Sequence, residues 1–356
     1  MQCTRTSMSA RVTQSTLALV PDSSFLRSAC LAPNTYKAYR RAVAVFLRDS
    51  GLRFTDLTTH SIHTIDLYCA AWIESEYEAG GSRSYAENLE SGLAFFVPRL
   101  KGLLREAKLR LRGWRRRPPV GLQCKSYPPM PLHLATLMSV HIAATRPQSD
   151  MRDLRAAVAI LLSFDCYLRV NECLRLRSAD VRMPRDGRLG LAYLHAAVHL
   201  RQTKTLENMT VQVRDPVVAR LLHRCIIGLA PHDRVFPFSD DIYRSRYFHP
   251  TLAALGLSHL GFVPHSLRHG GATHDYVVRR CSEAYIKRRG RWASDKSANR
   301  YVQTLHAVDL TFLVPAALDD EGAGYHRHLE WVMDRAIGDD LPGLPPLSEA
   351  VASQRA

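Results

Sequence analysis

Apolar side chains recur at helical spacing over most of the first hundred residues. From Tyr36 to Leu47 they lie three or four positions apart, with basic residues on the other faces, which predicts an amphipathic helix. Asn34 and Thr35 stand just before it as N-cap residues. Further helices are predicted over residues 61–79, 82–96 and 98–110. The first block is therefore expected to be a helical bundle.

The second block combines helices with two short strands. The pattern predicts an apolar helix from Leu154 to Phe164 that is buried on most sides. Residues 190–200 and 209–213 alternate between apolar and polar positions, as strands do, and residues 201–208 would form the hairpin connection. Helical patterns return over residues 216–229, 239–254, 265–279, 282–289, 295–305 and 327–337. The predicted fold class is mostly α (α+β): an N-terminal helical bundle and a mostly helical C-terminal domain with a small antiparallel sheet.

Prolines and local composition set the expected domain boundaries. Residues 1–29 are rich in Ser and Thr, and we interpret them as a disordered tail rather than a transit peptide. Prolines at positions 118, 119, 128, 129 and 131 prevent a continuous helix, which predicts an interdomain linker over residues 113–131. The expected domains are residues 30–112 and 132–310, followed by a C-terminal tail over residues 311–356.

Composition narrows the classes of function. A chain of 356 residues suits two domains, and 46% hydrophobic residues supply a sizeable core. The formal net charge of +15 favours a polyanionic partner, most commonly nucleic acid, over a protein adsorbed on membranes or merely soluble. The eight cysteines form no C-x-x-C pair, which is typical of a reducing intracellular compartment. No apolar run reaches the roughly 18 residues of a membrane span.

Basic residues gather at two places in the first block. A charge run is most often a solvated face, but beside a linker between two basic domains it also suits contact with a DNA backbone. The candidate DNA-binding residues are Lys37, Arg40, Arg41, Arg115, Arg116 and Arg117.

Two short pairs in the second block have the chemistry of a phosphate site. Arg169 and Glu172 follow the apolar helix three positions apart; they form either an exposed ion pair or a rigid guanidinium fork held by the carboxylate. His265 and Arg268 follow Pro264 at the start of a predicted helix, where the helix dipole favours an anion. The histidines lack metal-ligand spacing, so no metal is assigned.

Three further residues extend this set. Trp292 and Tyr301 lie nine positions apart, with Ser294 as the expected cap of a short helix that carries Tyr301. Taken alone, each aromatic residue is usually a packing residue, and the indole can only donate a hydrogen bond. Lys204 lies at the tip of the predicted hairpin, either as a solvated turn residue or as an ammonium that protonates a leaving oxygen.

The order of these residues resembles that of the tyrosine recombinases, or phage-type integrases. The matching segments are Tyr-Leu-Arg-Val-Asn-Glu-Cys-Leu-Arg-Leu (167–176), Thr-Lys-Thr (203–205), His-Ser-Leu-Arg-His-Gly (265–270) and Gly-Arg-Trp-Ala-Ser with Arg-Tyr-Val (290–302). The resemblance covers residues 135–305, and the helices at 30–115 are similar to the family's core-binding domain in pattern only. Most members have histidine where this chain has Trp292, and a Cre-like subset has tryptophan.

The resemblance implies both a mechanism and partners. Arg169, Lys204, His265, Arg268 and Trp292 would surround a scissile phosphate with Glu172 as support, and Tyr301 would attack it, without metal or cofactor. The partners would be double-stranded DNA and further copies of the chain, as a homo-tetramer on two DNA sites. The expected compartment is intracellular: the nucleus in a eukaryote, the cytoplasm or nucleoid in a bacterium. A type IB topoisomerase, or a catalytically silent DNA-binding protein derived from a mobile element, remains the alternative.

Overall fold

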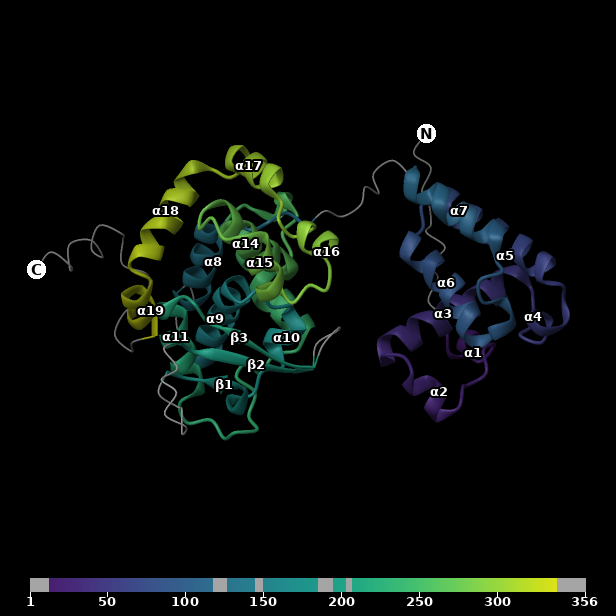
Figure 1. The fold of residues 1–356 in the computed structure, drawn as a ribbon, viewed down its shortest axis with the longest axis horizontal. Helices are drawn as coiled ribbons and strands as arrows, with labels where there is room; N and C mark the ends of the chain where they lie inside the picture. Colours follow the sequence, from purple (N-terminus) through teal and green to yellow (C-terminus); the bar gives the residue numbers. More distant parts are fainter. Residues whose placement is uncertain (1–12, 118–126, 145–149, 185–194, 203–206, 338–356) are drawn as a thin grey trace, which may run out of the picture. The chain divides into compact units, whose positions relative to one another are not determined.

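The computed structural model describes residues 13–117, 127–144, 150–184, 195–202 and 207–337 (Figure 1). The chain divides into two compact units, Met1–Lys125 and Ser126–Ala356, which are described separately. The predicted position of Lys204, and part of the strand predicted from residue 190, fall outside the described residues. No helix among the described residues is long and apolar enough to cross a membrane.

The described part of the first unit is a bundle of α-helices around one apolar core. Helix α6 packs against α3 and α7, and α5 packs against α7, so that Phe46, Leu89 and Trp114 meet in the core. The elements are α1 (Gln14–Leu17), α2 (Phe25–Ala29), α3 (Pro33–Ser50), α4 (Asp56–Thr59), α5 (Ile62–Glu78), α6 (Arg83–Phe96), the 3-10 turn η1 (Pro98–Leu100) and α7 (Arg105–Arg116).

The limits of the helices in this unit differ from those predicted. Helix α3 begins at Pro33 instead of after Asn34 and Thr35, because proline suits the first turn of a helix. Residues 14–17 and 25–29, inside the expected disordered tail, are helical, and the segment around Val20 is held by Arg40. Helix α7 extends to Arg116, into the expected linker.

Helix α7 starts at residue 105 because a buried carboxylate from another helix caps it. Asp66, on α5, is 5% exposed, and its two oxygens accept the backbone N–H groups of Glu106 and Ala107, each at 2.9 Å. These N–H groups have no partner within the helix, and the dipole at a helix start favours a negative charge. Asp66 therefore joins α5 to α7 and sets where α7 begins.

Asp66→Ala is expected to lower the free energy of unfolding of the first unit by about 2 kcal/mol, because two buried N–H groups lose their acceptor. Urea unfolding followed by far-UV circular dichroism measures the loss. Glu78→Ala, at the exposed end of the same helix, is the matched control and should cost less than about 0.5 kcal/mol. Equal losses in the two variants would contradict the capping role.

The described part of the second unit is mostly helical with a small antiparallel sheet, as the sequence predicts. The sheet has three strands in the order β1-β2-β3, and β1 is an addition to the two strands that were predicted. Helices α8 and α9 lie in its middle (Figure 1), and α11, α14, α18 and α19 pack against one or both of them. The elements are α8 (Leu132–Ala144), α9 (Met151–Asp165), α10 (Val170–Leu174), η2 (Ser178–Asp180), β1 (Val181–Arg182), β2 (Ala197–Gln202), β3 (Glu207–Gln212), α11 (Pro216–Ile226), α12 (Asp240–Ile242), the π-helical turn η3 (Tyr243–Phe248), α13 (His249–Ala254), η4 (Ser258–Leu260), α14 (Pro264–Val277), α15 (Glu283–Gly290), α16 (Asp295–Asn299), α17 (Thr304–Leu313), α18 (Ala316–Arg327) and α19 (Leu329–Ile337).

Helix α8 is missing from the sequence prediction, because it is apolar on all sides and shows no amphipathic period. The single helix predicted over 239–254 is divided by the π-helical turn η3. The expected domain limit at residue 310 falls inside α17, and the segment expected as a C-terminal tail contains α18 and α19. Tyr325, Leu329 and Met333 of this segment belong to the main core, because α18 and α19 cover α8.

Candidate active site

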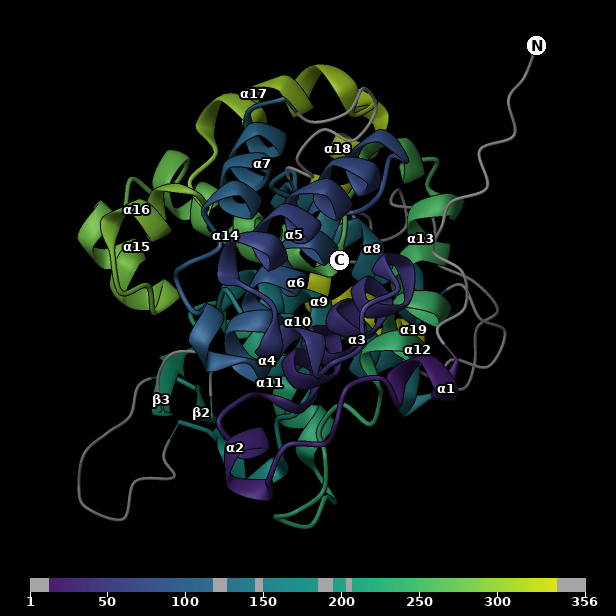
Figure 2. The ribbon, with the colours of Figure 1, turned by 90° about the vertical axis from the view of Figure 1, so that its right-hand side faces the viewer.

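Helix and loop ends bring five of the six predicted catalytic residues together in the second unit. Arg169 is the N-cap residue of α10, and His265 and Arg268 lie in the first turns of α14. Trp292 follows α15 and Tyr301 follows α16, two helices that pack side by side (Figures 1 and 2). Lys204 belongs to the connection after Gln202, which pairs with Glu207, and lies outside the described residues.

Arg268 is the buried centre of the site. Its side chain is 0% exposed, and its guanidinium donates to the backbone oxygens of Tyr167 and, at 2.6 Å, Gly290. The Cζ atom lies 4.9 Å from the ring centroid of Trp292 and 5.2 Å from that of Tyr301. Two aromatic faces and two carbonyl oxygens thus stabilise a cation that has lost its water.

Glu172 holds the site's arginines through both carboxylate oxygens. Oε1 accepts from Arg169 at 2.5 Å, while Oε2 accepts the Arg169 backbone N–H at 3.0 Å and the Arg291 guanidinium at 2.9 Å. Arg268 approaches Oε2 to 3.7 Å. Burial alone would raise the pKa of Glu172, but Arg291 and the other donors outweigh it and lower the pKa below its usual value. The predicted support of Arg169 by Glu172 has this geometric basis.

The ring of Tyr301 stacks on two neighbours. Its centroid lies 4.5 Å from Trp292 and 4.5 Å from His269, both at an interplanar angle of 29°, and 5.5 Å from His265, edge to face. Gly290 allows Trp292 to reach this position, because a Cβ atom there would lie 2.0 Å from the indole ring. These contacts place the phenol ring over Arg268.

The backbone of Tyr301 is anchored to α14. The Thr273 hydroxyl donates to the Tyr301 carbonyl oxygen at 3.0 Å and accepts the Gln303 backbone N–H at 3.1 Å. Ser294 caps the short helix α16 as predicted, but the expectation that this helix carries Tyr301 is wrong. Helix α16 ends at Asn299, and Tyr301 lies in the following turn, with its N–H bonded to Ala298 O at 2.8 Å. The attachment to Thr273 replaces the helix as support.

Two histidines beside Tyr301 are held in the neutral form. Burial, together with Arg268 and Arg169, lowers the pKa of His265 from 6.5 to about 4. Burial, His265 and Arg268 lower the pKa of His269 to about 3. A neutral imidazole can accept a proton, and a phosphate anion beside it would raise its pKa again.

Three buried N–H donors at this site have no acceptor among the described residues: Nε of Arg268, Nε of Arg291 and Nε1 of Trp292. A buried N–H group without an acceptor costs free energy, so an anionic oxygen that reached these groups would be bound favourably. Arg169 adds a guanidinium that is 25% exposed. The chemistry of the site is therefore that of an oxyanion receptor beside a phenol. No group of three His, Cys, Asp or Glu side chains in the described ranges is placed to hold a metal ion.

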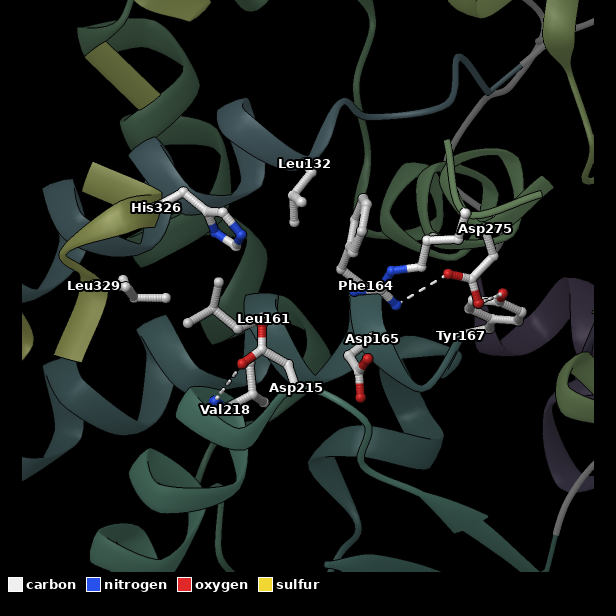
Figure 3. A pocket seen from close by; sticks show the side chains of 12 residues that line it. Leu132, Leu161, Phe164, Asp165, Tyr167, Asp215, Val218, Asp275, His326 and Leu329 are labelled. Atoms are coloured by element: carbon white, nitrogen blue, oxygen red, sulfur yellow. Dashed lines mark hydrogen bonds and ion pairs between the residues drawn. The ribbon is translucent and has the colours of Figure 1, made fainter. Parts of the chain in front are cut away.

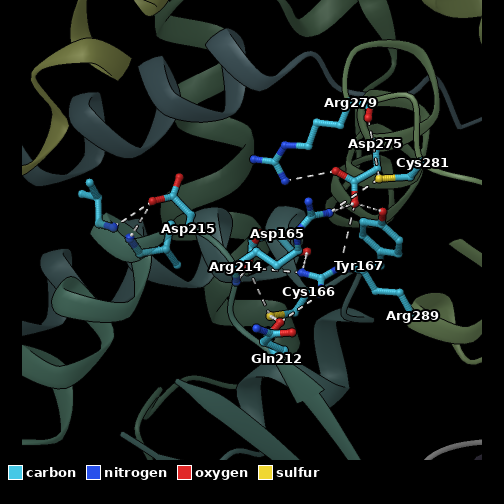
Figure 4. A network of polar contacts seen from close by, with 12 residues as sticks. Asp165, Cys166, Tyr167, Gln212, Arg214, Asp215, Asp275, Arg279, Cys281 and Arg289 are labelled. Carbon is cyan, nitrogen blue, oxygen red and sulfur yellow. Dashed lines mark hydrogen bonds and ion pairs between the residues drawn. The ribbon is translucent and has the colours of Figure 1, made fainter. Parts of the chain in front are cut away.

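A network of ion pairs around the buried carboxylates Asp165 and Asp275, absent from the predicted set, is connected to the site through Tyr167 (Figure 4). The Tyr167 hydroxyl donates to Asp275, which also pairs with Arg214 at 2.9 Å and Arg279 at 3.1 Å. Arg289 pairs with Asp165 at 3.4 Å and lies over the Tyr167 ring. No local pattern separates Asp165, Asp275 and Arg289 from surface charges, because their burial depends on how α9, α14 and α15 pack.

A small cavity near this network is distinct from the candidate site (Figure 3). Its lining includes Tyr167, Asp275, His326 and Leu329, but none of the predicted catalytic residues. Tyr167 lines the cavity, and its carbonyl oxygen accepts a hydrogen bond from Arg268. The cavity therefore lies beside the candidate site and is connected to it through Tyr167.

The candidate DNA-binding residues all lie in the first unit. Lys37, Arg41, Arg116 and Arg117 are exposed. Arg40 pairs with Asp22 at 2.6 Å and donates to Val20 O at 3.1 Å, and Arg115 pairs with Glu87 at 3.1 Å.

Comparison with known families agrees with this geometry. Residues 137–307 match the model of the phage integrase family, so this segment is a domain of the phage integrases, or tyrosine recombinases. The matched segment includes every residue of the predicted catalytic set. No curated protein matches the chain.

Solved structures with a similar fold are recombinases. A lambda integrase dimer bound to a COC′ core site has 18% sequence identity and a TM-score of 0.53, covering 78% of this chain and 92% of that one. The Tn1549 transposon integrase in complex with transposon right end DNA has 14% identity and a TM-score of 0.49, covering 77% and 90%. The XerH recombinase bound to its difH substrate has 16% identity and a TM-score of 0.47, covering 78% of each chain. At these identities, the match to lambda integrase shows the fold.

Lowering the pH from about 6.5 to about 4 should destabilise the second unit. In this window the unfolded chain binds protons that folded His265 and His269 do not, so the free energy of unfolding rises with pH. His265→Gln removes one such site and should flatten the dependence, measured by urea unfolding across the window. Identical slopes for His265→Gln and wild type would show that folded His265 takes up its proton near pH 6.5.

Proposed function

We propose that this protein is a site-specific recombinase or integrase that cuts and rejoins double-stranded DNA through a 3′-phosphotyrosine on Tyr301. The phage integrase domain over residues 137–307 supports recombinase activity. The observation that carries the assignment of residues is the position of the Tyr301 ring, between Trp292 and His269 and over Arg268. A tyrosine placed only for packing would not need buried cations on one side.

The cations of the site neutralise the phosphate during attack. A phosphodiester is anionic, and negative charge grows on its non-bridging oxygens as the tyrosine oxygen approaches. Arg169 presents an accessible fork, while Arg268 and Trp292 offer donors without an acceptor. Arg268 has no exposed surface. A DNA phosphate therefore reaches the Arg268 guanidinium when the Tyr301 ring moves towards the DNA backbone that Tyr301 attacks.

The reaction exchanges one ester for another. The Tyr301 oxygen bonds to phosphorus and the bond from phosphorus to the 5′ oxygen breaks, leaving a free 5′-hydroxyl. The tyrosine proton passes to neutral His265, and Lys204 gives a proton to the departing oxygen. Rejoining reverses these steps with the 5′-hydroxyl of another strand. The ester is retained, so the exchange proceeds without ATP or a metal ion.

The partners in this proposal are DNA and other copies of the chain. Exchange between two duplexes requires four cut strands and therefore a homo-tetramer on two sites. Lys37, Arg40, Arg41, Arg115, Arg116 and Arg117 would contact the DNA backbone from residues 30–112 and the segment that follows. The lambda integrase, XerH and Tn1549 structures each contain DNA, which supports DNA as the partner. The protein would act wherever the DNA of its cell lies.

Tyr301→Phe should abolish a covalent adduct while leaving DNA binding intact. The substrate is a pool of nicked duplexes with randomised central positions, and denaturing electrophoresis detects protein that remains attached to DNA. Tyr276→Phe, a half-buried tyrosine of α14, is the matched control and should form the adduct at the wild-type rate.

An adduct that survives Tyr301→Phe would overturn the assignment of the nucleophile. Wild-type protein that binds the pool but forms no adduct would instead identify a silent DNA-binding protein. Relaxation of supercoiled plasmid without site preference or a partner duplex would identify a topoisomerase.

Arg169→Lys should slow adduct formation on the order of 100-fold while DNA affinity changes by less than about threefold, because an ammonium cannot form two parallel bonds to phosphate. Arg175→Lys, the exposed residue at the end of the same helix α10, is the control and should match wild type. Equal losses of binding and cleavage in Arg169→Lys would refute the clamp role.

A further inference from the structure

Two residues beside the candidate site have a left-handed backbone that favours glycine. Tyr167 has φ +48° and Arg291 has φ +58°, and both are buried. The conformation costs a non-glycine residue free energy, and such residues persist where surrounding contacts hold them. Here the two are in direct contact, since the Arg291 guanidinium donates to the Tyr167 carbonyl oxygen at 3.0 Å.

Arg291 occupies a place where its side chain contacts four oxygens. It is 5% exposed and follows Gly290 at the end of α15. Besides Tyr167 O, it donates to Glu172 Oε2 at 2.9 Å and to the backbone oxygens of Cys166 and Arg289, both at 3.3 Å. Glycine would fit this backbone at lower cost, so the side chain must offset the strain through these contacts.

Each of the two acceptors nearest the site is shared between Arg291 and a predicted catalytic arginine. Tyr167 O accepts from Arg268 as well as from Arg291. Glu172 Oε2 lies 2.9 Å from Arg291 but 3.7 Å from Arg268, and Oε1 holds Arg169. Arg291 therefore prevents Glu172 from forming a close ion pair with Arg268. It also fixes the Tyr167 carbonyl oxygen, which orients the Arg268 guanidinium.

We propose that Arg291 is a positioning residue for strand cleavage: it neutralises Glu172 and fixes the Tyr167 carbonyl, so that Arg268 and Arg169 keep donors free for phosphate. The hydrogen bonds of the Arg291 guanidinium go to Glu172 and to three backbone oxygens, and not to the Tyr301 ring or to Arg268. Arg291 acts through Glu172 and Tyr167, and through the adjacent Trp292, whose backbone it precedes. This inference rests on the proposed recombinase function.

The chain supplies a matched control for this inference. Arg280, between α14 and α15, is a third non-glycine residue with positive φ, +54°, and it is exposed. Arg280→Gly and Arg291→Gly remove the same side chain and the same charge, and both relieve the same backbone strain. Any difference between the two variants comes from the contacts of the Arg291 side chain.

The experiment compares single-turnover adduct formation on the nicked duplex pool at saturating protein, where affinity no longer limits the rate. Arg291→Gly should cleave on the order of 100-fold more slowly than Arg280→Gly, because small misplacements of reacting groups cost about that much. Arg280→Gly should cleave within about twofold of wild type and raise the melting temperature by about 2–4 °C. DNA affinity should be equal in the two variants. Equal cleavage rates would overturn the inference.

Two further measurements separate the possible failures. Glu172→Gln in the Arg291→Gly background should add far less than its effect in wild type, whereas multiplicative losses would contradict action through Glu172. If Arg291→Gly does not fold, Arg291→Lys replaces it and should lose at least tenfold, since lysine lacks the fixed fork; a wild-type rate would overturn the inference. Absence of any wild-type adduct overturns the proposed function itself, while an adduct with equal rates in both glycine variants overturns only the role of Arg291.

Discussion

The site depends on one buried carboxylate that compensates several buried cations. Glu172 is 9% exposed and bonds to Arg169 and Arg291, with Arg268 at 3.7 Å. Three guanidinium groups would repel one another and lose their hydration if the carboxylate were absent. With it, the cluster still carries an excess of positive charge, and that excess is what an incoming phosphate meets. The stability of the arginine cluster and its ability to bind phosphate therefore both depend on the Glu172 carboxylate.

Hydrogen bonds through Tyr167 connect the arginine cluster around Glu172 to helix α14. Tyr167 connects the two levels, because its carbonyl accepts from Arg268 and Arg291 and its hydroxyl donates to Asp275. Asp275 lies on α14, the helix that also carries Arg268 and anchors Tyr301 through Thr273. A displacement of α14 against α9 would thus move nucleophile and cation together, which preserves their mutual geometry.

The sequence predicted features that depend on local patterns, and it did not predict features that depend on how the helices pack together. Helical periods predicted α3, α5 and α6 closely, and short segments with fixed order located Arg169, His265 and Tyr301. Helix α8 was not predicted, because an apolar helix shows no amphipathic pattern. The role of Arg291 was not predicted, because a sequence does not show its left-handed backbone conformation. The catalytic assignments, Lys204 above all, stay predictions.

The tryptophan at position 292 makes physical sense in this surrounding. Its ring stacks on Tyr301 and Tyr167, at centroid distances of 4.5 and 6.2 Å, and covers the Arg268 guanidinium at 4.9 Å. An imidazole has the N–H donor but a smaller ring, so it would leave part of this buried cation uncovered. The indole ring packs between Tyr301 and Tyr167, and its N–H remains a hydrogen-bond donor without an acceptor among the described residues. Close packing against Gly290 fixes the Trp292 ring, and the stacked Trp292 ring in turn fixes the position of the Tyr301 ring.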